Sequence, residues 1–357
     1  MDRYICFCEK NNGVTQRWLD TLNNIGIGEI KILEVLNLKG GYEVNLGGRR
    51  VYVGAVDDVT FTVNSNEIIG IAGESGCGKS TLIKLIYGFN QPPLMVKSGK
   101  ILLKLQDNNV VDLLSIDREY LRKKIWWKEI AYIPQNSMNV LDPTKRIKDQ
   151  FKELFKYHDI DINPKEMIEF VADYLKGLGL PIDVLNSYPH QLSGGMKQRI
   201  VIALSLILKP RIVLADEPTT AVDVVTQLAI LSLLKKWQKD NKTSLIIVSH
   251  DMGVHAYMAD RIFIMYAGQI VESDSKENIF KNPKHPYTSG LIKSIIKKGE
   301  KELKAGLPGQ PPDLINPPHG CKFHPRCPFA MDICRHESPP ILVVDNGFVR
   351  CWLYARK

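Results

Sequence analysis

Residues 73–80 constrain the fold more than any other part of this sequence. They read GESGCGKS, which matches the pattern G-x-x-x-x-G-K-S, and they lie between an apolar run at 67–72 and a helix-like run at 81–86. A strand, a glycine-rich loop and a helix in this order form a phosphate-binding loop. Backbone N–H groups of the loop and the positive end of the helix attract phosphate groups. The motif therefore predicts a nucleoside triphosphate site in an α/β domain.

Individual positions of this loop have expected roles. Lys79 can reach the β- and γ-phosphates, and the Ser80 hydroxyl can bind Mg²⁺. Cys77 is interpreted as a compact filler rather than as a reactive thiol. The residues expected to bind the nucleotide at this loop are Gly73, Ser75, Gly76, Cys77, Gly78, Lys79, Ser80 and Thr81.

Polar residues follow three later apolar runs, each interpreted as a buried strand. Gln135 follows the run at 131–133 and can contact Mg²⁺ or the attacking water. Asp216 and Glu217 follow the run at 212–215, where Asp216 can hold Mg²⁺ through water and Glu217 can act as general base. His250 follows the run at 243–248 and can hydrogen-bond the γ-phosphate.

A second segment resembles an anion-binding helix start. Ser193, Gly194 and Gly195 precede an apolar helix at 200–208, and a helix N-terminus of this kind favours phosphate. A single nucleotide needs one such helix for its γ-phosphate. We therefore expect this segment to serve a nucleotide bound by another molecule.

The remaining pattern divides into β-rich and helical parts. Residues 32–38 alternate as a half-buried strand, a turn is expected at 40–41, and 51–63 holds two β-like runs. Tyr42 and Tyr52, which lie upstream of the phosphate loop, can each stack on an adenine ring. The other expected elements are helices at 147–155, 164–178 and 224–237, a strand at 100–105 and a hairpin at 261–271.

The charge and the apolar runs of the sequence argue against a membrane-spanning or secreted protein. The chain has 357 residues and a formal net charge of +8, which suits several acidic partners but identifies none. The longest apolar run, at 200–208, is about half the length of a membrane span. The first residues lack the apolar core of a secretory signal. We therefore expect a cytoplasmic protein. Residues 1–29 are expected to form an extension outside the main domain, and their sequence indicates no function.

Taken together, these motifs resemble the ATPase subunit of an ABC transporter. The segment LSGGMKQR at 192–199 carries most of the resemblance, together with the phosphate loop, Gln135 and His250 in the expected order. The resemblance implies a P-loop NTPase fold: a RecA-like α/β core with an antiparallel β-subdomain and a helical subdomain. It implies an ATPase domain at 30–275, with the helical subdomain at about 137–190, and a C-terminal extension at 276–357.

The resemblance narrows to the di/oligopeptide importer branch. The segments at 282–294 and 307–312 resemble the C-terminal extension of that branch. The resemblance implies ATP hydrolysis with Mg²⁺ and favours Tyr42 over Tyr52 at the adenine. It also implies a head-to-tail sandwich of two ATPase subunits. There Ser193, Gly194, Gly195 and Gln198 would contact the partner's ATP, and Asp223 would lie in the D-loop.

The expected partners follow from the same resemblance. They are a second ABC ATPase subunit, with a heterodimer favoured over a homodimer, two membrane permeases and, indirectly, an extracytoplasmic solute-binding protein. No nucleic acid is expected, and the subunit would lie peripherally on the cytoplasmic face of the membrane. Import of oligosaccharides by the same ATPase is one alternative. A soluble ABC ATPase acting on nucleic acid or the ribosome is an alternative of another class.

Four cysteines near the C-terminus form the one metal-like pattern, Cys321, Cys327, Cys334 and Cys351. Four thiolates suit zinc or an iron–sulfur cluster, and a loop-rich tail gains stability from such a centre. The resemblance to the importer branch favours a [4Fe-4S] cluster. If the metal is zinc, His319, His324 and His336 are further potential ligands.

Overall fold

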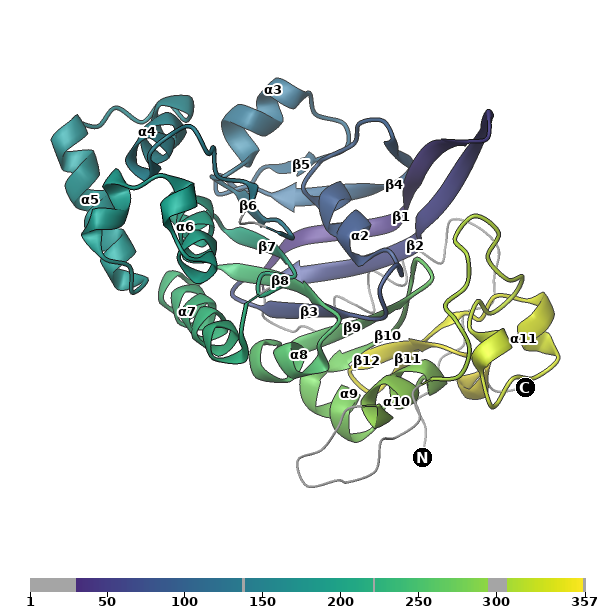
Figure 1. Cartoon of the computed structure of the whole chain (residues 1–357). Coiled ribbons are helices and arrows are strands. Elements are labelled where there is room, and N and C mark those ends of the chain that lie inside the picture. Colours follow the sequence, from purple (N-terminus) through teal and green to yellow (C-terminus); the bar gives the residue numbers. More distant parts are fainter. Residues whose placement is uncertain (1–29, 137–138, 221, 295–306, 356–357) are drawn as a thin grey trace. The chain divides into compact units, whose positions relative to one another are not determined.

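The computed structural model describes residues 30–136, 139–220, 222–294 and 307–355 (Figure 1). These residues form two compact units. The first comprises the described residues up to Ser115 and from Val248 onward, and the second comprises Ile116–Ile247. The expected extension at 1–29 lies outside the described residues. None of the helices in the described ranges has the length and hydropathy needed to span a membrane.

The first unit contains a four-stranded antiparallel sheet. Its strands are β1 (Lys31–Leu46), β2 (Arg49–Asn64), β4 (Leu94–Lys104) and β5 (Val110–Asp112), in the order β2-β1-β4-β5. The core face carries β-branched and aromatic side chains, which favour strands; Val35 and Phe61 pair across β1 and β2 and are almost fully buried. This sheet confirms the expected antiparallel β-subdomain.

The turn expected at Gly40 and Gly41 was wrong. Strand β1 runs straight through both glycines, although its register against β2 shifts on either side of Gly40. A Cβ atom added to Gly41 would lie 1.9 Å from the carbonyl oxygen of Val53. Glycine here permits a close approach of two backbones. The chain turns at Gly47 and Gly48, where φ is +56° and +80°.

A second group of strands in the first unit carries the phosphate loop. The order is β11 (Ile341–Val344), β12 (Gly347–Arg350), β10 (Gln269–Ser275), β9 (Arg261–Tyr266) and β3 (Ile68–Ala72). Strands β3 and β9 are parallel, and β9 and β10 form the expected hairpin. The helices are α2 (Lys79–Ile86), α8 (Met252–Met258), α9 (Lys276–Lys281), α10 (Pro286–Lys293) and α11 (Ile333–His336).

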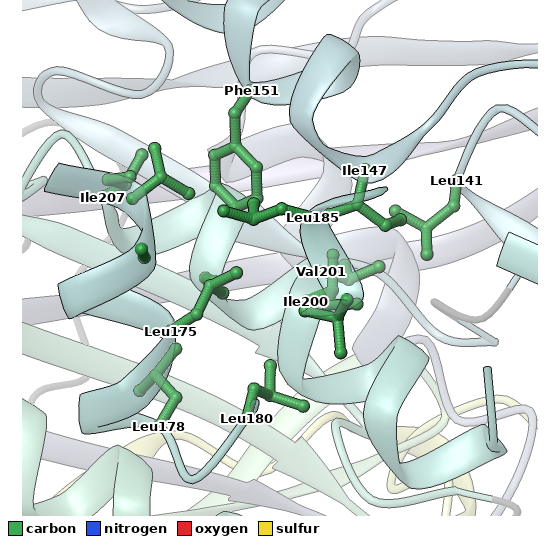
Figure 2. Close-up of a cluster of buried hydrophobic side chains, with 14 of the residues drawn as sticks. Leu141, Ile147, Phe151, Leu175, Leu178, Leu180, Leu185, Ile200, Val201 and Ile207 are labelled. Carbon is green, nitrogen blue, oxygen red and sulfur yellow. The ribbon is translucent and has the colours of Figure 1, made fainter. Parts of the chain in front are cut away.

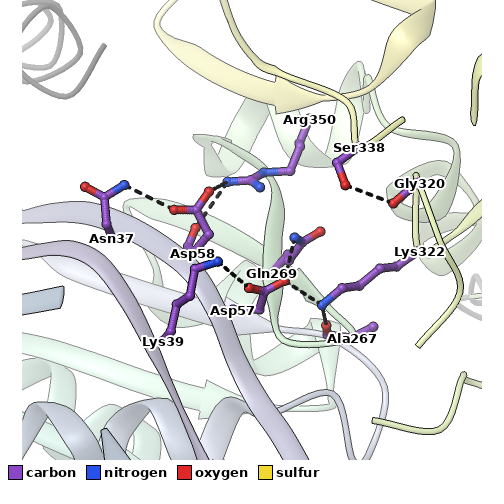
Figure 3. Close-up of polar contacts among 10 residues, drawn as sticks. All are labelled: Asn37, Lys39, Asp57, Asp58, Ala267, Gln269, Gly320, Lys322, Ser338 and Arg350. Carbon is purple, nitrogen blue, oxygen red and sulfur yellow. Dashed lines mark hydrogen bonds and ion pairs between the residues drawn. The ribbon is translucent and has the colours of Figure 1, made fainter. Parts of the chain in front are cut away.

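The C-terminal region is less loop-rich than expected. Strands β11 and β12 form a hairpin, and β12 pairs with β10 through Glu272 and Val349. Figure 3 shows two ion pairs between this region and β2. Lys322 Nζ lies 2.9 Å from an Asp57 carboxylate oxygen, and Arg350 Nη2 lies 3.1 Å from one of Asp58. The C-terminal region is therefore built into the first unit.

The second unit combines parallel strands with most of the helices. Its strands are β6 (Ile130–Ile133), β7 (Ile212–Asp216) and β8 (Ser244–Ser249), which begins in this unit, in the order β8-β7-β6. Strands β6 and β7 are parallel. The α-helices are α3 (Arg118–Tyr120), α4 (Ile147–Tyr157), α5 (Pro164–Gly177), α6 (Gly194–Leu206) and α7 (Val224–Asn241).

Helix positions in this unit follow from local signals. Asn163 caps α5 by accepting the Lys165 N–H at 2.9 Å, and Pro164 occupies the first helical position. The apolar faces of α4, α5 and α6 meet in one buried cluster (Figure 2). Phe151 on α4, Leu175 on α5 and Ile200 on α6 are fully buried in it. Burial of this cluster is the main stabilising contribution to the helical part of the unit.

Leu175→Ala is expected to destabilise the chain by about 3–5 kcal/mol, because it leaves a cavity in a closely packed cluster. Leu228→Ala on α7 is the matched control, since that side chain is 53% exposed. We expect the control to cost about 0.5 kcal/mol or less. Denaturant unfolding followed by far-UV circular dichroism measures both. Equal costs for the two variants would contradict the packing shown in Figure 2.

Candidate nucleotide-binding site

The phosphate loop connects β3 to α2, as its sequence predicts. Gly73, Gly76 and Gly78 have φ values of +152°, +81° and +107°. Gly78 precedes the first residue of α2, and a Cβ atom there would lie 1.9 Å from the Ala55 carbonyl oxygen. A side chain at this position would therefore require the backbone to move. The glycine serves both the left-handed turn and the close approach.

Lys79 begins α2 and is buried. Its ammonium group donates to the carbonyl oxygens of Gly73 at 2.7 Å and of Glu74 at 2.9 Å. The amine thus lies across the mouth of the loop, where a phosphate oxygen can replace a carbonyl as its acceptor. Ser80 follows it and is half-buried, and Ser75 and Gly76 are exposed.

Tyr42 and Tyr52 lie in different surroundings. The Thr81 hydroxyl on α2 donates to Tyr42 Oη at 3.2 Å, which places Tyr42 beside the helix that follows the loop. The ring of Tyr52 lies under the Lys97 ammonium group, 4.7 Å from its centroid. Tyr42 stays the proposed aromatic neighbour of a nucleotide, and it contacts the helix that follows the loop.

His250 is exposed at the end of β8, and a second histidine lies close by in the interior. His255 on α8 is fully buried and its Nε2 lies 3.0 Å from the Ser249 carbonyl oxygen. Burial lowers the pKa of His255 to about 4, so it is neutral at physiological pH. It packs under β3, where a Cβ added to Gly70 would lie 2.4 Å from its Nδ1. His255 therefore has a structural role that the sequence did not indicate.

The second unit brings together three of the predicted site residues. Strands β6 and β7 are parallel and Ile133 pairs with Ala215, so Gln135 and the Asp216–Glu217 pair leave the same edge. Asp216 is 1% exposed, and the Tyr132 hydroxyl donates to its Oδ2 at 3.2 Å. A buried carboxylate oxygen is a ligand type that Mg²⁺ prefers.

Glu217 has a backbone conformation that is unusual for its residue type. Its φ is +46°, and the Thr220 hydroxyl donates to its Oε2 at 3.0 Å. A left-handed backbone at a glutamate costs free energy and occurs more often at functional sites than elsewhere. Tyr132 and Thr220, which hold these two carboxylates, were missed because neither has a distinguishing sequence pattern.

The segment at 193–198 starts α6 as expected. The Ser193 hydroxyl oxygen caps the helix by accepting the Met196 N–H at 3.4 Å, and Gly194 and Gly195 form its first turn. Gln198 is 2% exposed, and its side-chain amide donates to the Pro218 carbonyl oxygen. Gln198 thus links α6 to the segment after Glu217 within the same unit. Asp223 caps α7 by accepting the N–H groups of Val225 and Thr226, both at 3.0 Å.

The structure does not support the predicted iron–sulfur or zinc centre. All four tail cysteines are described, but in the described ranges no group of three or more His, Cys, Asp or Glu side chains is arranged to hold a metal. Burial raises the thiol pKa to about 11 for Cys321 and about 12 for Cys351, so both thiols are protonated near neutral pH in the metal-free chain. His324 Nδ1 lies 3.0 Å from the Cys321 carbonyl oxygen, and His336 is exposed. Packing around Phe323 and pairing of β12 hold this region instead.

Two families of known proteins match parts of this chain. Residues 56–220 match the family described as "ABC transporter", and residues 271–334 match "Oligopeptide/dipeptide transporter, C-terminal region". The chain belongs to the ABC transporter family. Its nucleotide-binding fold resembles the dimeric post-hydrolysis structure of the ATP-binding cassette MJ0796 bound to ADP and Pi. That match has a TM-score of 0.59 and 26% identity over 69% of this chain and 99% of that one.

Relatives within the ABC transporter family cover nearly the whole chain. The dipeptide transport ATP-binding protein DppD of Caldanaerobacter subterraneus is 43% identical over 326 residues, 90% of this chain and 97% of the relative. The oligopeptide transport ATP-binding protein OppD of Bacillus subtilis is 41% identical over 334 residues, 90% of this chain and 89% of the relative.

Cys77 is expected to resist alkylation in the folded chain. It is 4% exposed, and burial raises its thiol pKa although the Lys79 ammonium opposes the shift. The thiolate that reacts with iodoacetamide is therefore scarce near neutral pH. Mass spectrometry of the tryptic peptide should show modification at least about tenfold slower than in denatured chain. Equal rates in the two states would contradict the buried position.

Proposed function

We propose that this chain hydrolyses ATP and thereby drives import of dipeptides or oligopeptides, as the peripheral ATPase subunit of an ABC importer. The observation that carries the proposal is one chain in which Lys79 lies across a glycine-rich phosphate loop and the C-terminal region has the oligopeptide/dipeptide type. The loop supplies the chemistry, and the C-terminal region indicates the kind of cargo. The proposed location is the cytoplasmic face of the membrane.

The proposal gives each predicted site residue a role in the reaction. Backbone N–H groups of the loop and Lys79 bind the ATP phosphates, and Tyr42 lies against the adenine. Mg²⁺, when bound, neutralises charge on the transferred phosphoryl group, and Ser80, Gln135 and Asp216 would hold it. Glu217 orients the attacking water and accepts its proton, and His250 donates a hydrogen bond to the γ-phosphate.

The proposed assembly contains two nucleotide-binding subunits. Each phosphate loop would face Ser193, Gly194 and Gly195 of the other subunit, because a capped helix start offers free N–H groups to a γ-phosphate. Asp223, which caps the next helix, would lie at the same interface. We propose a heterodimer with a second ATPase subunit. Two permeases and a solute-binding protein would complete the transporter.

Co-expression with the permeases and the solute-binding protein of its own organism's peptide transporters tests this function. We expect the chain to purify with the permeases in detergent, and the solute-binding protein to bind peptides in calorimetric titration. Binding of an oligosaccharide instead would replace the cargo and keep the ATPase. Purification with nucleic acid or ribosomes and without permeases would overturn the proposal.

A further inference from the structure

Glu74, the second residue of the phosphate loop, is held by a side chain from the distant C-terminal region. Arg326, which lies 252 positions later in the sequence, forms a bidentate ion pair with the Glu74 carboxylate. Nη1 lies 2.7 Å from Oε2, and Nη2 lies 2.9 Å from Oε1. Paired N–H···O contacts of this kind are the strongest geometry available to an arginine and a carboxylate.

Arg326 is itself fixed in place. Its Nε donates to the Pro308 carbonyl oxygen at 2.8 Å, and its guanidinium carbon lies 5.8 Å from the centroid of the Tyr266 ring. The side chain is only 5% exposed. A buried guanidinium with three directed contacts keeps one orientation, so the charge that it presents to Glu74 is constant.

The backbone of Glu74 is held by the same region. Its N–H donates to the Tyr287 hydroxyl at 2.9 Å. Tyr287 is fully buried against Tyr266 and Phe323, and its own N–H donates to His285 Nδ1 at 3.0 Å. The His-Pro-Tyr segment at the start of α10 thus aims a hydroxyl group at the phosphate loop.

Without Arg326, the charge of Glu74 would oppose the binding of a triphosphate at the loop. Its carbonyl oxygen accepts from Lys79, the residue proposed to bind the phosphates, so Glu74 lies beside the proposed phosphate site. A charge in the loop lies within roughly one Debye length, ~8 Å, of a bound triphosphate. An unpaired carboxylate there would repel ATP, whereas a carboxylate paired with Arg326 presents little net charge.

We propose that Arg326 is a positioning residue of the nucleotide site, which neutralises Glu74 and so sets the affinity for ATP from the C-terminal region. The proposal rests on the proposed binding of ATP phosphates at residues 73–80. It assigns to the oligopeptide-type C-terminal region an effect on nucleotide affinity as well as a structural role.

The two partners should have opposite effects on affinity. Arg326→Ala leaves the Glu74 carboxylate unpaired and is expected to weaken Mg-ATP binding on the order of tenfold. Glu74→Gln leaves the charge of the Arg326 guanidinium unopposed near the phosphates, so binding should be tighter. Glu74→Gln combined with Arg326→Ala should bind more tightly than Arg326→Ala alone. The rate at saturating ATP should stay within about twofold, since neither side chain has a role in the chemical step.

Arg350→Ala is the matched control. Arg350 is also a buried arginine of the C-terminal region, 6% exposed, and pairs with Asp58 instead of the loop (Figure 3). We expect it to lower the thermal midpoint much as Arg326→Ala does, with the ATP affinity unchanged. Arg326→Lys should recover part of the affinity, because it restores charge without the paired geometry.

Calorimetric titration of the full chain with Mg-ATP, in the Glu217→Gln background to prevent turnover, decides between the outcomes. If Glu74→Gln and Arg326→Ala both weaken binding, Arg326 only braces the loop and the charge proposal is wrong. If neither changes affinity while Lys79→Ala abolishes it, the proposal fails and the nucleotide site stands. If Lys79→Ala also binds normally, the proposed site itself is wrong. Should Arg326→Ala not fold, Glu74→Gln alone still tests the sign.

Discussion

Replacing Glu217 with glutamine is expected to lower steady-state ATP turnover by about 10²–10⁴-fold, while Mg-ATP binding stays within about twofold. Glu217 follows the buried Asp216, and the Thr220 hydroxyl holds its carboxylate at 3.0 Å. Glutamine keeps the shape of the side chain but cannot accept a proton from water. Phosphate release by the purified chain and calorimetric binding measure the two effects separately.

The matched control for this variant is Glu153→Gln. Glu153 lies on α4 in the same unit, and its exposed carboxylate pairs with Lys145 at 2.6 Å. Surface pairs of this kind contribute little, so both turnover and binding should be unchanged. Sustained hydrolysis by the Glu217→Gln variant at near wild-type rate would remove Glu217 from the reaction.

Lys79→Ala is expected to weaken Mg-ATP binding by on the order of 100-fold or more, and to lower turnover with it. The Lys79 ammonium group is buried at the loop and already donates to two loop carbonyls. Without it, the loop loses its one directed positive charge toward the β- and γ-phosphates. Fluorescence titration with a labelled ATP analogue measures the change.

Lys84→Ala provides the control, because Lys84 lies one and a half turns further along α2 and is half-buried. It should bind ATP like the wild type. A thermal melt of both variants separates loss of binding from loss of fold. Normal binding by Lys79→Ala would show that the nucleotide binds elsewhere.

Local signals predicted much of the fold. Helix α5 begins at Pro164 after Asn163, as the proline and the capping residue indicate, and it ends within one residue of the expected position. The strand, loop and helix around residues 73–80 also follow the sequence pattern. In these cases the residues that determine the structure lie within a few positions of one another.

Predictions failed where a residue acts on a distant partner. Gly40 and Gly41 look like a turn in the sequence, but Gly41 is needed because the backbone of Val53 lies against it. The Gln198 amide donates to the Pro218 carbonyl oxygen, a contact within the chain that the sequence did not indicate, while its contact with a partner's nucleotide stays a prediction. Cysteine spacing predicted a metal centre, whereas the described side chains do not form one.

The link between the loop and the C-terminal region could not be predicted. Glu74 occupies a variable position of the motif, and nothing near Arg326 in the sequence refers to it. Glu74 and Arg326 are 252 positions apart in the sequence, and only the fold of the first unit brings them into contact. The loop motif therefore predicts the nucleotide, while the structure is needed to find the ion pair that we propose sets its affinity.

Peptide uptake by proteoliposomes tests the central claim most directly. The vesicles would contain this chain, its partner ATPase and both permeases, with the solute-binding protein outside and ATP inside. We predict accumulation of labelled dipeptide or oligopeptide that requires internal Mg-ATP and is lost with Glu217→Gln. Uptake that continues without ATP, or with Glu217→Gln, would contradict the account.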